Sequence, residues 1–250
     1  MSDIKIETHV KASFSFTHIG AIILYSYNLI SLNYYLALIL LILFCKVGAT
    51  FPDLDLEWKN IQNKTLVNFI INKIIYFTKG RHRSWQTHSW DICIGIGILG
   101  YMGLNRLQSN NLLNHCDYEV LFVIFAGFML GWCSHLFTDM LTTRGVRLFF
   151  FLDYKITLVP GISNKKKVSI MFIILFAIGF YLLNIGNLYG IIIVGLSIVF
   201  FCLNVKYRNS NYSTGSKWED LVYKIVKILN VITAFISIIY PWLYNTYIIK

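Results

Sequence analysis

The chain has 250 residues, of which 56% are hydrophobic and 14% are charged, whereas soluble proteins average about 45–50% apolar and about 25% charged residues. This composition excludes an ordinary water-soluble domain, and the abundance of apolar side chains excludes intrinsic disorder. The net charge of +10 leaves two classes, a nucleic-acid binder or an integral membrane protein with cationic loops.

Apolar runs close to 20 residues long recur along the chain, and a run of this length can cross a hydrocarbon layer about 30 Å thick. In chain order these predicted spans are 12–30, 33–51, 88–107, 118–138, 169–185, 188–205 and 225–244. Residues 57–79 place apolar side chains at helical spacing among lysines and asparagines, which is typical of a basic amphipathic helix on a membrane surface. We therefore predict an all-α, polytopic integral membrane protein with about six or seven transmembrane helices, one amphipathic surface helix and a single membrane domain over residues 1–250.

The 22 lysines and arginines indicate how these spans are oriented. When successive loops are assigned to alternate sides of the membrane, nearly all cationic residues fall on the side of the N-terminus, and only Arg106 and Lys250 fall on the other side. Cytoplasmic loops carry such an excess, so we expect a multi-pass protein with a cytoplasmic N-terminus and the lipid bilayer as its partner. Because topology accounts for the positive charge, a nucleic-acid partner is not expected.

Histidine and aspartate occur at the cytoplasmic ends of three predicted spans. In chain order these residues are Asp53, Asp55, His82, His88, His135 and Asp139. On a helix, His135 and Asp139 project from the same face about 5–6 Å apart, close enough to bind one ion or to bridge two. In an extended stretch, Asp53 and Asp55 point to the same side.

Imidazole and carboxylate ligands together suit Zn²⁺, Mn²⁺ or Fe²⁺, whereas Ca²⁺ prefers oxygen ligands alone. This many ligands exceeds the need of one tetrahedral ion, so the pattern favours more than one divalent metal. Such clusters activate water for the hydrolysis of a phosphoester or related ester, and the catalytic base would be an aspartate, Asp53 or Asp139. The arginines Arg81, Arg83 and Arg144 are suited to binding a substrate phosphate, although the positive-inside rule explains them equally well.

Each motif also has a simpler explanation. The segment from Pro52 to Asp55 is equally consistent with a loop turn or a cap of the next helix, and His82 between its two arginines with a basic patch that contacts anionic lipid head groups. The first span offers two histidines, His9 and His18, on opposite helix faces, so we expect only one of them at the site. At about 1.5 Å per residue, His9 falls at the cytoplasmic mouth and His18 in mid-membrane, so depth favours His9.

Taken together, the motifs resemble those of the YdjM-like family, bacterial inner-membrane proteins described as membrane-bound metal-dependent hydrolases. The family pattern is an early Thr-His, then Pro-Asp-x-Asp, His-Arg-x-x-Thr-His-Ser and Gly-x-x-x-His-x-x-x-Asp-x-x-Thr-x-x-Gly-Val. The residues of this chain that match it are Thr8, His9, Pro52, Asp53, Asp55, His82, Arg83, Thr87, His88, Ser89, Gly131, His135, Asp139, Thr142, Gly145 and Val146. Two features depart from it, because three residues instead of two separate Arg83 from Thr87 and Leu56 stands where many members have a histidine.

The resemblance covers residues 8–160 and leaves 161–250 as additional transmembrane helices. It implies an inner-membrane hydrolase that acts on an ester or phosphoester, including one in a lipid head group. The predicted metal ligands are His9, Asp53, Asp55, His82, His88, His135 and Asp139. Two alternatives remain open. One is an ion- or proton-coupled transporter that uses the same cluster. The other is a catalytically degenerate membrane protein, because Leu56 replaces a histidine that many family members have.

Overall fold

The computed structural model describes residues 6–58, 61, 64–77, 86–141, 145–147, 149–151, 155–157 and 215–243, and these residues are mostly helical. In chain order the elements are α1 (Ile6–Ser26), α2 (Tyr34–Thr50), the short 3₁₀ helix η1 (Pro52–Asp55), α3 (Leu66–Phe77), α4 (Trp90–Ser109), α5 (His115–Met140), β1 (Val146–Arg147), β2 (Lys155–Ile156) and α8 (Gly215–Leu243). The described residues are therefore mostly helical, as predicted, with one short pair of strands.

Three segments of the described chain are long and apolar enough to cross a membrane, namely Tyr34–Asp55, His115–Met140 and Tyr223–Trp242. They correspond to the predicted spans 33–51, 118–138 and 225–244. Helices α1 and α4 coincide with two further predicted spans, and α1 is less apolar because serine, threonine and histidine side chains interrupt it. The predicted spans 169–185 and 188–205 lie outside the described residues, so the number of membrane crossings remains a prediction.

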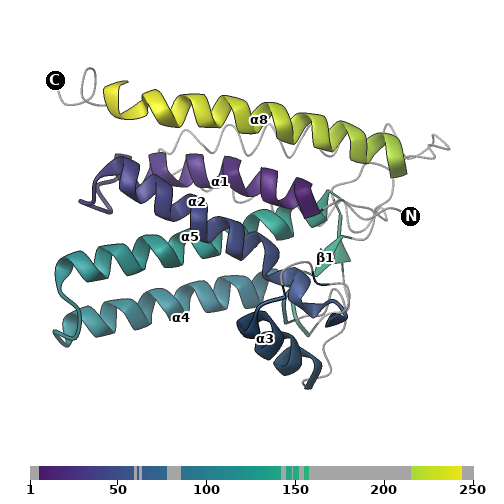
Figure 1. Cartoon of the computed structure of the whole chain (residues 1–250), viewed down its shortest axis with the longest axis horizontal. Helices are drawn as coiled ribbons and strands as arrows, with labels where there is room; N and C mark the ends of the chain where they lie inside the picture. The colour runs from purple at the N-terminus through teal and green to yellow at the C-terminus, as the bar shows by residue number, and fades with distance from the viewer. Residues whose placement is uncertain are drawn as a thin grey trace, which may run out of the picture.

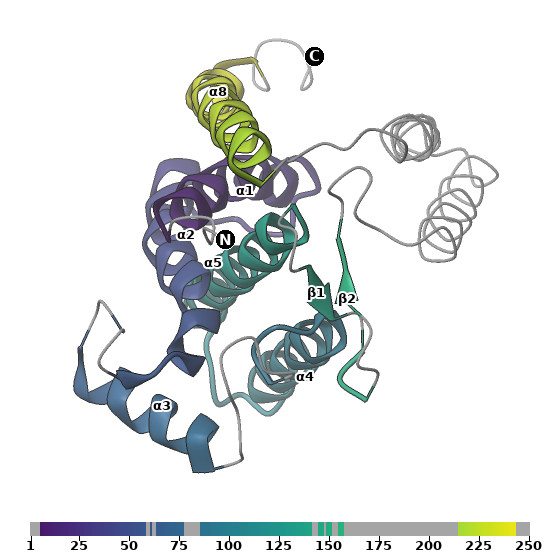
Figure 2. The same ribbon diagram turned by 90° about the vertical axis from the view of Figure 1, so that its right-hand side faces the viewer.

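Helix α5 lies at the centre of the bundle, where it packs against α1, α2 and α4, while α8 covers α1 (Figures 1 and 2). The five long helices of the described chain, α1, α2, α4, α5 and α8, run in alternating directions along the long axis of the molecule, whereas α3 lies across it. As a result α1 begins, α2 ends, α4 begins and α5 ends at one end of the bundle, on the right in Figure 1. The antiparallel pair of β1 and β2 lies at the same end, with Val146 opposite Ile156 and Arg147 opposite Lys155.

Helices α2 and α5 touch backbone to backbone. A Cβ atom on Gly48 would lie 1.9 Å from the carbonyl oxygen of Phe128, and one on Gly131 would lie 2.0 Å from that of Cys45. A larger residue at either position would force the helices apart, and small residues are what allow helices to approach this closely. This contact holds the C-terminal ends of α2 and α5, and the polar residues they carry, next to each other.

The predicted amphipathic helix within residues 57–79 is present as α3, over the shorter range Leu66–Phe77. It packs on η1 through Ile75, which belongs to the same buried cluster as Leu54. The side-chain NH₂ of Asn72 donates to the carbonyl oxygens of Leu54 at 2.6 Å and Leu56 at 2.8 Å. Helix α3 is therefore attached to the segment that carries Asp53 and Asp55.

Candidate metal centre

The C-terminal end of α5 contributes two of the predicted site residues. His135 and Asp139 lie about one helical turn apart, and His135 Nε2 is 3.7 Å from Asp139 Oδ2. Only 1% of each side chain is exposed. His135 Nε2 also lies 3.9 Å from Oδ1 of Asp53 on η1, so the end of α5 faces the segment that follows α2.

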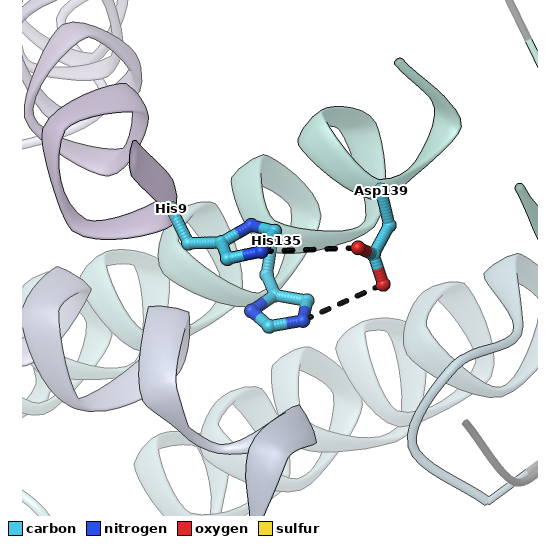
Figure 3. Close-up of side chains that lie close together, drawn as sticks. All are labelled: His9, His135 and Asp139. Carbon is cyan, nitrogen blue, oxygen red and sulfur yellow. Dashed lines mark ion pairs between the residues drawn. The ribbon is translucent and has the colours of Figure 1, made fainter. Parts of the chain in front are cut away.

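The first turn of α1 places His9 against His135. The two rings stack with their centroids 4.0 Å apart and their planes inclined by 14°. His9 Nε2 lies 3.8 Å from Asp139 Oδ1, whereas His135 faces Oδ2 of the same carboxylate (Figure 3). The two oxygens of Asp139 therefore point to histidines from different helices.

The third histidine, His88, lies just before α4. Its Nε2 atom is 3.4 Å from Asp139 Oδ2, and its Nδ1 atom is 3.0 Å from Asp55 Oδ2. The hydroxyl of Thr87 donates to the same oxygen of Asp55 at 2.8 Å. The backbone here is held independently, because the indole N–H of Trp132 donates to the carbonyl oxygen of Thr87 at 2.8 Å.

Two of the three histidines have Nδ1 next to a group that can only accept a hydrogen bond. For His135 this group is the carbonyl oxygen of Ala49, at 2.7 Å, and for His88 it is the carboxylate of Asp55. An acceptor at this position fixes Nδ1 as the protonated ring nitrogen. When the rings are neutral, the Nε2 atoms of both carry lone pairs directed into the cluster.

His9 follows the same pattern. Its Nδ1 atom is hydrogen-bonded to the hydroxyl of Thr138, and that hydroxyl donates its own hydrogen to the carbonyl oxygen of Ser134 at 3.0 Å or of His135 at 2.9 Å. The Thr138 oxygen therefore accepts from His9 Nδ1–H. Outer partners of this kind are typical of metal-binding histidines, whose remaining nitrogen is the ligand.

Two overlapping groups of side chains have the spacing of a metal site. Ligand atoms of His9, His135 and Asp139 lie within 4.8 Å of one another, and so do those of Asp53, His88 and His135. Oδ2 of Asp53 is buried and has no hydrogen-bond partner within the part of the chain that the structure describes. Carboxylates gathered in a buried site repel one another unless cationic charge lies between them. The residues present therefore fit a divalent metal ion.

A comparison with protein families identifies the family of this chain. The model of the YdjM inner membrane protein family matches residues 8–211. The chain belongs to the YdjM family. The match begins at Thr8, beside His9, and includes every residue of the cluster, which confirms the resemblance drawn from the motifs. Membership makes this YdjM protein an inner-membrane protein, and no curated protein and no solved structure matches it.

The structure brings together six of the seven ligands predicted for this YdjM protein: His9, Asp53, Asp55, His88, His135 and Asp139. The Asp53–Asp55 stretch was predicted to be extended, whereas in the structure it forms the 3₁₀ helix η1. Because a 3₁₀ helix turns the chain, Asp53 faces His135 while Asp55 faces Nδ1 of His88. Asp55 belongs to neither metal-sized group, so its geometry is that of a residue that positions His88.

The other predicted residues lie outside this cluster or outside the described residues. His18 is buried further along α1, with Nδ1 2.7 Å from Ser237 Oγ on α8. His82, Arg81, Arg83 and Arg144 lie outside the described residues, so their roles as metal ligand and phosphate-binding groups remain predictions.

Sequence reasoning assigned no role to the residues that orient the histidines. Thr87 lies inside the His-Arg motif and Thr138 precedes Asp139, so their neighbours could have indicated them. The carbonyl oxygen of Ala49 has no sequence signal, because every residue carries one.

Proposed function

We propose that this YdjM family protein is a metal-dependent hydrolase of the inner membrane that cleaves an ester or phosphoester bond at the cytoplasmic face. The observation that carries the proposal is the convergence of three histidine Nε2 atoms on the carboxylate of Asp139, with Asp53 beside them. Imidazole and carboxylate together favour Zn²⁺, with Mn²⁺ or Fe²⁺ as alternatives.

The arrangement favours two ions over one. Together the two metal-sized groups offer three histidines and two aspartates, which is more than one tetrahedral ion takes, and Nε2 of His135 would bind one ion only. Asp139 directs Oδ1 towards His9 and Oδ2 towards His88 and His135, which suits a carboxylate that bridges two ions. When bound, divalent ions at this position would act as Lewis acids on the ester and supply a nucleophile from water at neutral pH.

Asp53 is the residue best suited to accept a proton. Its side chain is 17% exposed, compared with 1% for Asp139, so it lies at the accessible edge of the cluster. Its Oδ2 atom has no hydrogen-bond partner among the described residues. A general base must reach both the reacting proton and solvent, and we therefore assign this role to Asp53 and assign Asp139 to holding the ions.

The position of the cluster supports hydrolysis over transport. Transporters place their substrate and ion sites near the bilayer midplane, on interrupted helices. This cluster instead joins the beginnings of α1 and α4 to the ends of α2 and α5. The positive-inside pattern predicts that this end of a multi-pass protein faces the cytoplasm, which would give the site access to soluble head groups and metabolites.

The test is the metal content of the purified protein, measured by elemental mass spectrometry, together with hydrolysis of a chromogenic phosphodiester. We expect stoichiometric metal in the wild type and its loss in His135→Ala and Asp139→Ala. The matched control is His18→Ala, which removes a buried histidine from α1 outside the cluster and should leave metal content unchanged. A folded wild type that binds no added metal would contradict the proposal and favour a degenerate family member.

A further inference from the structure

Helix α3 exposes a continuous apolar face. Its residues are Leu66, Val67, Ile70, Ile74 and Phe77, with exposed fractions of 75%, 64%, 50%, 58% and 90%. At 3.6 residues per turn these positions fall within one arc of about 100°, and the opposite side packs on η1. An apolar face of this kind is unfavourable in water and marks an interaction surface.

A second apolar cluster lies at the same end of the bundle. Phe149, Phe150 and Phe151 are 38%, 46% and 66% exposed. The ring of Phe151 contacts those of Phe149 and Phe150, with centroids 5.4 and 5.3 Å apart. The backbone N–H of Phe150 donates to Oδ2 of Asp91 at 2.8 Å, in the first turn of α4. Figure 2, which looks onto this end, shows α3 and the β1–β2 pair on two sides of α4.

We propose that these two clusters, together called the interfacial surface, insert into the head-group region of the adjacent leaflet, and that the metal centre takes a phospholipid of that leaflet as its substrate. The bond cleaved is an ester or phosphoester at the level of the head group. The substrate part of this proposal rests on the hydrolase function proposed above, whereas the docking part does not.

The bilayer is the favoured partner because α3 lies at the end of α2, a helix whose exposed apolar face is suited to contact lipid. Ile39, Leu43 and Val47 recur every four residues along α2 and are 55%, 57% and 54% exposed, as expected for a face of a membrane-crossing helix. Helix α3 follows α2 in the chain and packs on η1 at the end of α2, so its exposed apolar face lies at the end of a membrane-crossing helix. The exposed side chains of Lys64 and Lys73 supply the positive charge that favours anionic lipids at such a surface.

Helix α3 is connected to the metal centre through η1. Asn72 donates to the carbonyl oxygens of Leu54 and Leu56, the residues on either side of Asp55. η1 also carries Asp53, the edge residue of the cluster. Helix α3 is therefore fixed to the segment that carries Asp53, so the depth of α3 in the bilayer sets the depth of Asp53.

Docking is tested by measuring depth in the full chain reconstituted into phosphatidylethanolamine and phosphatidylglycerol vesicles. Ile70→Cys and Phe150→Cys, each in a background without the native cysteines, carry a nitroxide label. We expect collisions with oxygen to exceed those with a water-soluble nickel chelate at both positions. A label at Asn110→Cys, in the exposed turn at the other end of α4, is the water-accessible control. Nickel accessibility equal to that control at Ile70 and Phe150 would overturn docking.

The substrate is tested by comparing phospholipid hydrolysis in vesicles with hydrolysis of a soluble phosphodiester. The double variant Ile70→Ser/Ile74→Ser should lower the rate on lipid about tenfold and leave the rate on the soluble ester unchanged, whereas Ile70→Leu/Ile74→Leu should retain both rates. Equal rates on lipid in the serine and leucine variants would overturn the role of α3 in presenting the lipid. A metal-loaded wild type that cleaves the soluble ester but no phospholipid would overturn the lipid substrate. A metal-loaded wild type that cleaves neither ester would overturn the hydrolase function and the lipid substrate together, and the label depths would still decide docking.

Discussion

The two ends of α5 each bury a carboxylate, in different company. Near the N-terminal end, Glu119 accepts the backbone N–H of Ser31 at 2.6 Å and the Ser31 hydroxyl at 2.8 Å. Near the C-terminal end, Asp139 faces the Nε2 atoms of three histidines. Glu119 also has a histidine nearby, since Nε2 of His115 lies 3.5 Å from its Oε1 atom, but that side chain is 70% exposed. The buried partners of Glu119 are hydrogen-bond donors, which stabilise a carboxylate as they stand. When the three histidines are neutral, their Nε2 atoms around Asp139 carry lone pairs, so acceptors face an acceptor, and a shared cation would stabilise them.

Helix α1 carries two buried histidines, His9 and His18, whose partners differ in the same way as those of the two carboxylates. His9 and His18 are both buried, at 4% and 8% exposure. His18 meets the hydroxyl of Ser237, which itself donates to the carbonyl oxygen of Ala234 at 3.0 Å. His18 therefore has a complete hydrogen bond to α8, whereas Nε2 of His9 faces Asp139. Burial and residue type are the same in the two cases, and the chemistry of the partner distinguishes a ligand from a packing residue.

Substitution of Asp139 should have the largest effect, and it tests the difference between the two ends of α5. Asp139→Asn should weaken metal binding by more than about 100-fold, because even outer partners of metal ligands are worth 10- to 100-fold. Glu119→Gln should leave metal affinity unchanged and lower stability by about 1–2 kcal/mol, because it weakens hydrogen bonds to a charged group. Metal titration followed by calorimetry and thermal unfolding in detergent measure the two effects. Equal losses of metal affinity would show that the two carboxylates do not differ as argued.

The positions of the helices could be predicted because apolar runs are local signals, but their ends could not. The first span was predicted at residues 12–30, whereas α1 is Ile6–Ser26. The residues before Ala12 are polar and yet helical, because His9 and Lys11 make contacts with α5 and α8. Hydropathy does not register a helical turn that is stabilised by tertiary contacts.

The cluster could be predicted because histidine and aspartate are rare in this chain and occur at the ends of spans. The separate roles of Asp53 and Asp55 could not, since their separation depends on the 3₁₀ turn of η1. Depth and the spacing to Pro52 favour His9 over His18, and the structure places His9 at the cluster. The pairing of Nδ1 atoms with Ala49 and Thr138 depends on the close contact of α2 with α5 and of α1 with α5, which no local pattern encodes.

Substitution of Thr87, which orients His88 through Asp55, should have a smaller effect on metal affinity. Thr87→Val keeps the volume of the side chain but removes the donor to Asp55, so the carboxylate holds His88 less firmly. Metal affinity should fall about tenfold, at the lower end of the range for outer partners, while the backbone stays held by Trp132. Thr87→Ser restores the hydroxyl and should restore affinity in the same titration. A valine variant with wild-type affinity would mean that Asp55 does not act through the orientation of His88.

The smallest expected effect concerns the histidine outside the cluster. Ser237→Ala removes the partner of His18 between α1 and α8 and should lower stability by about 0.6 kcal/mol, the average for a hydrogen bond between membrane helices. Thr233→Ala is the matched control, because the hydroxyl of Thr233 donates to carbonyl oxygens within α8. Thermal unfolding in detergent compares the two variants, and both should retain full metal content. Loss of metal from Ser237→Ala alone would make His18 part of the metal centre and remove the distinction between the two histidines of α1.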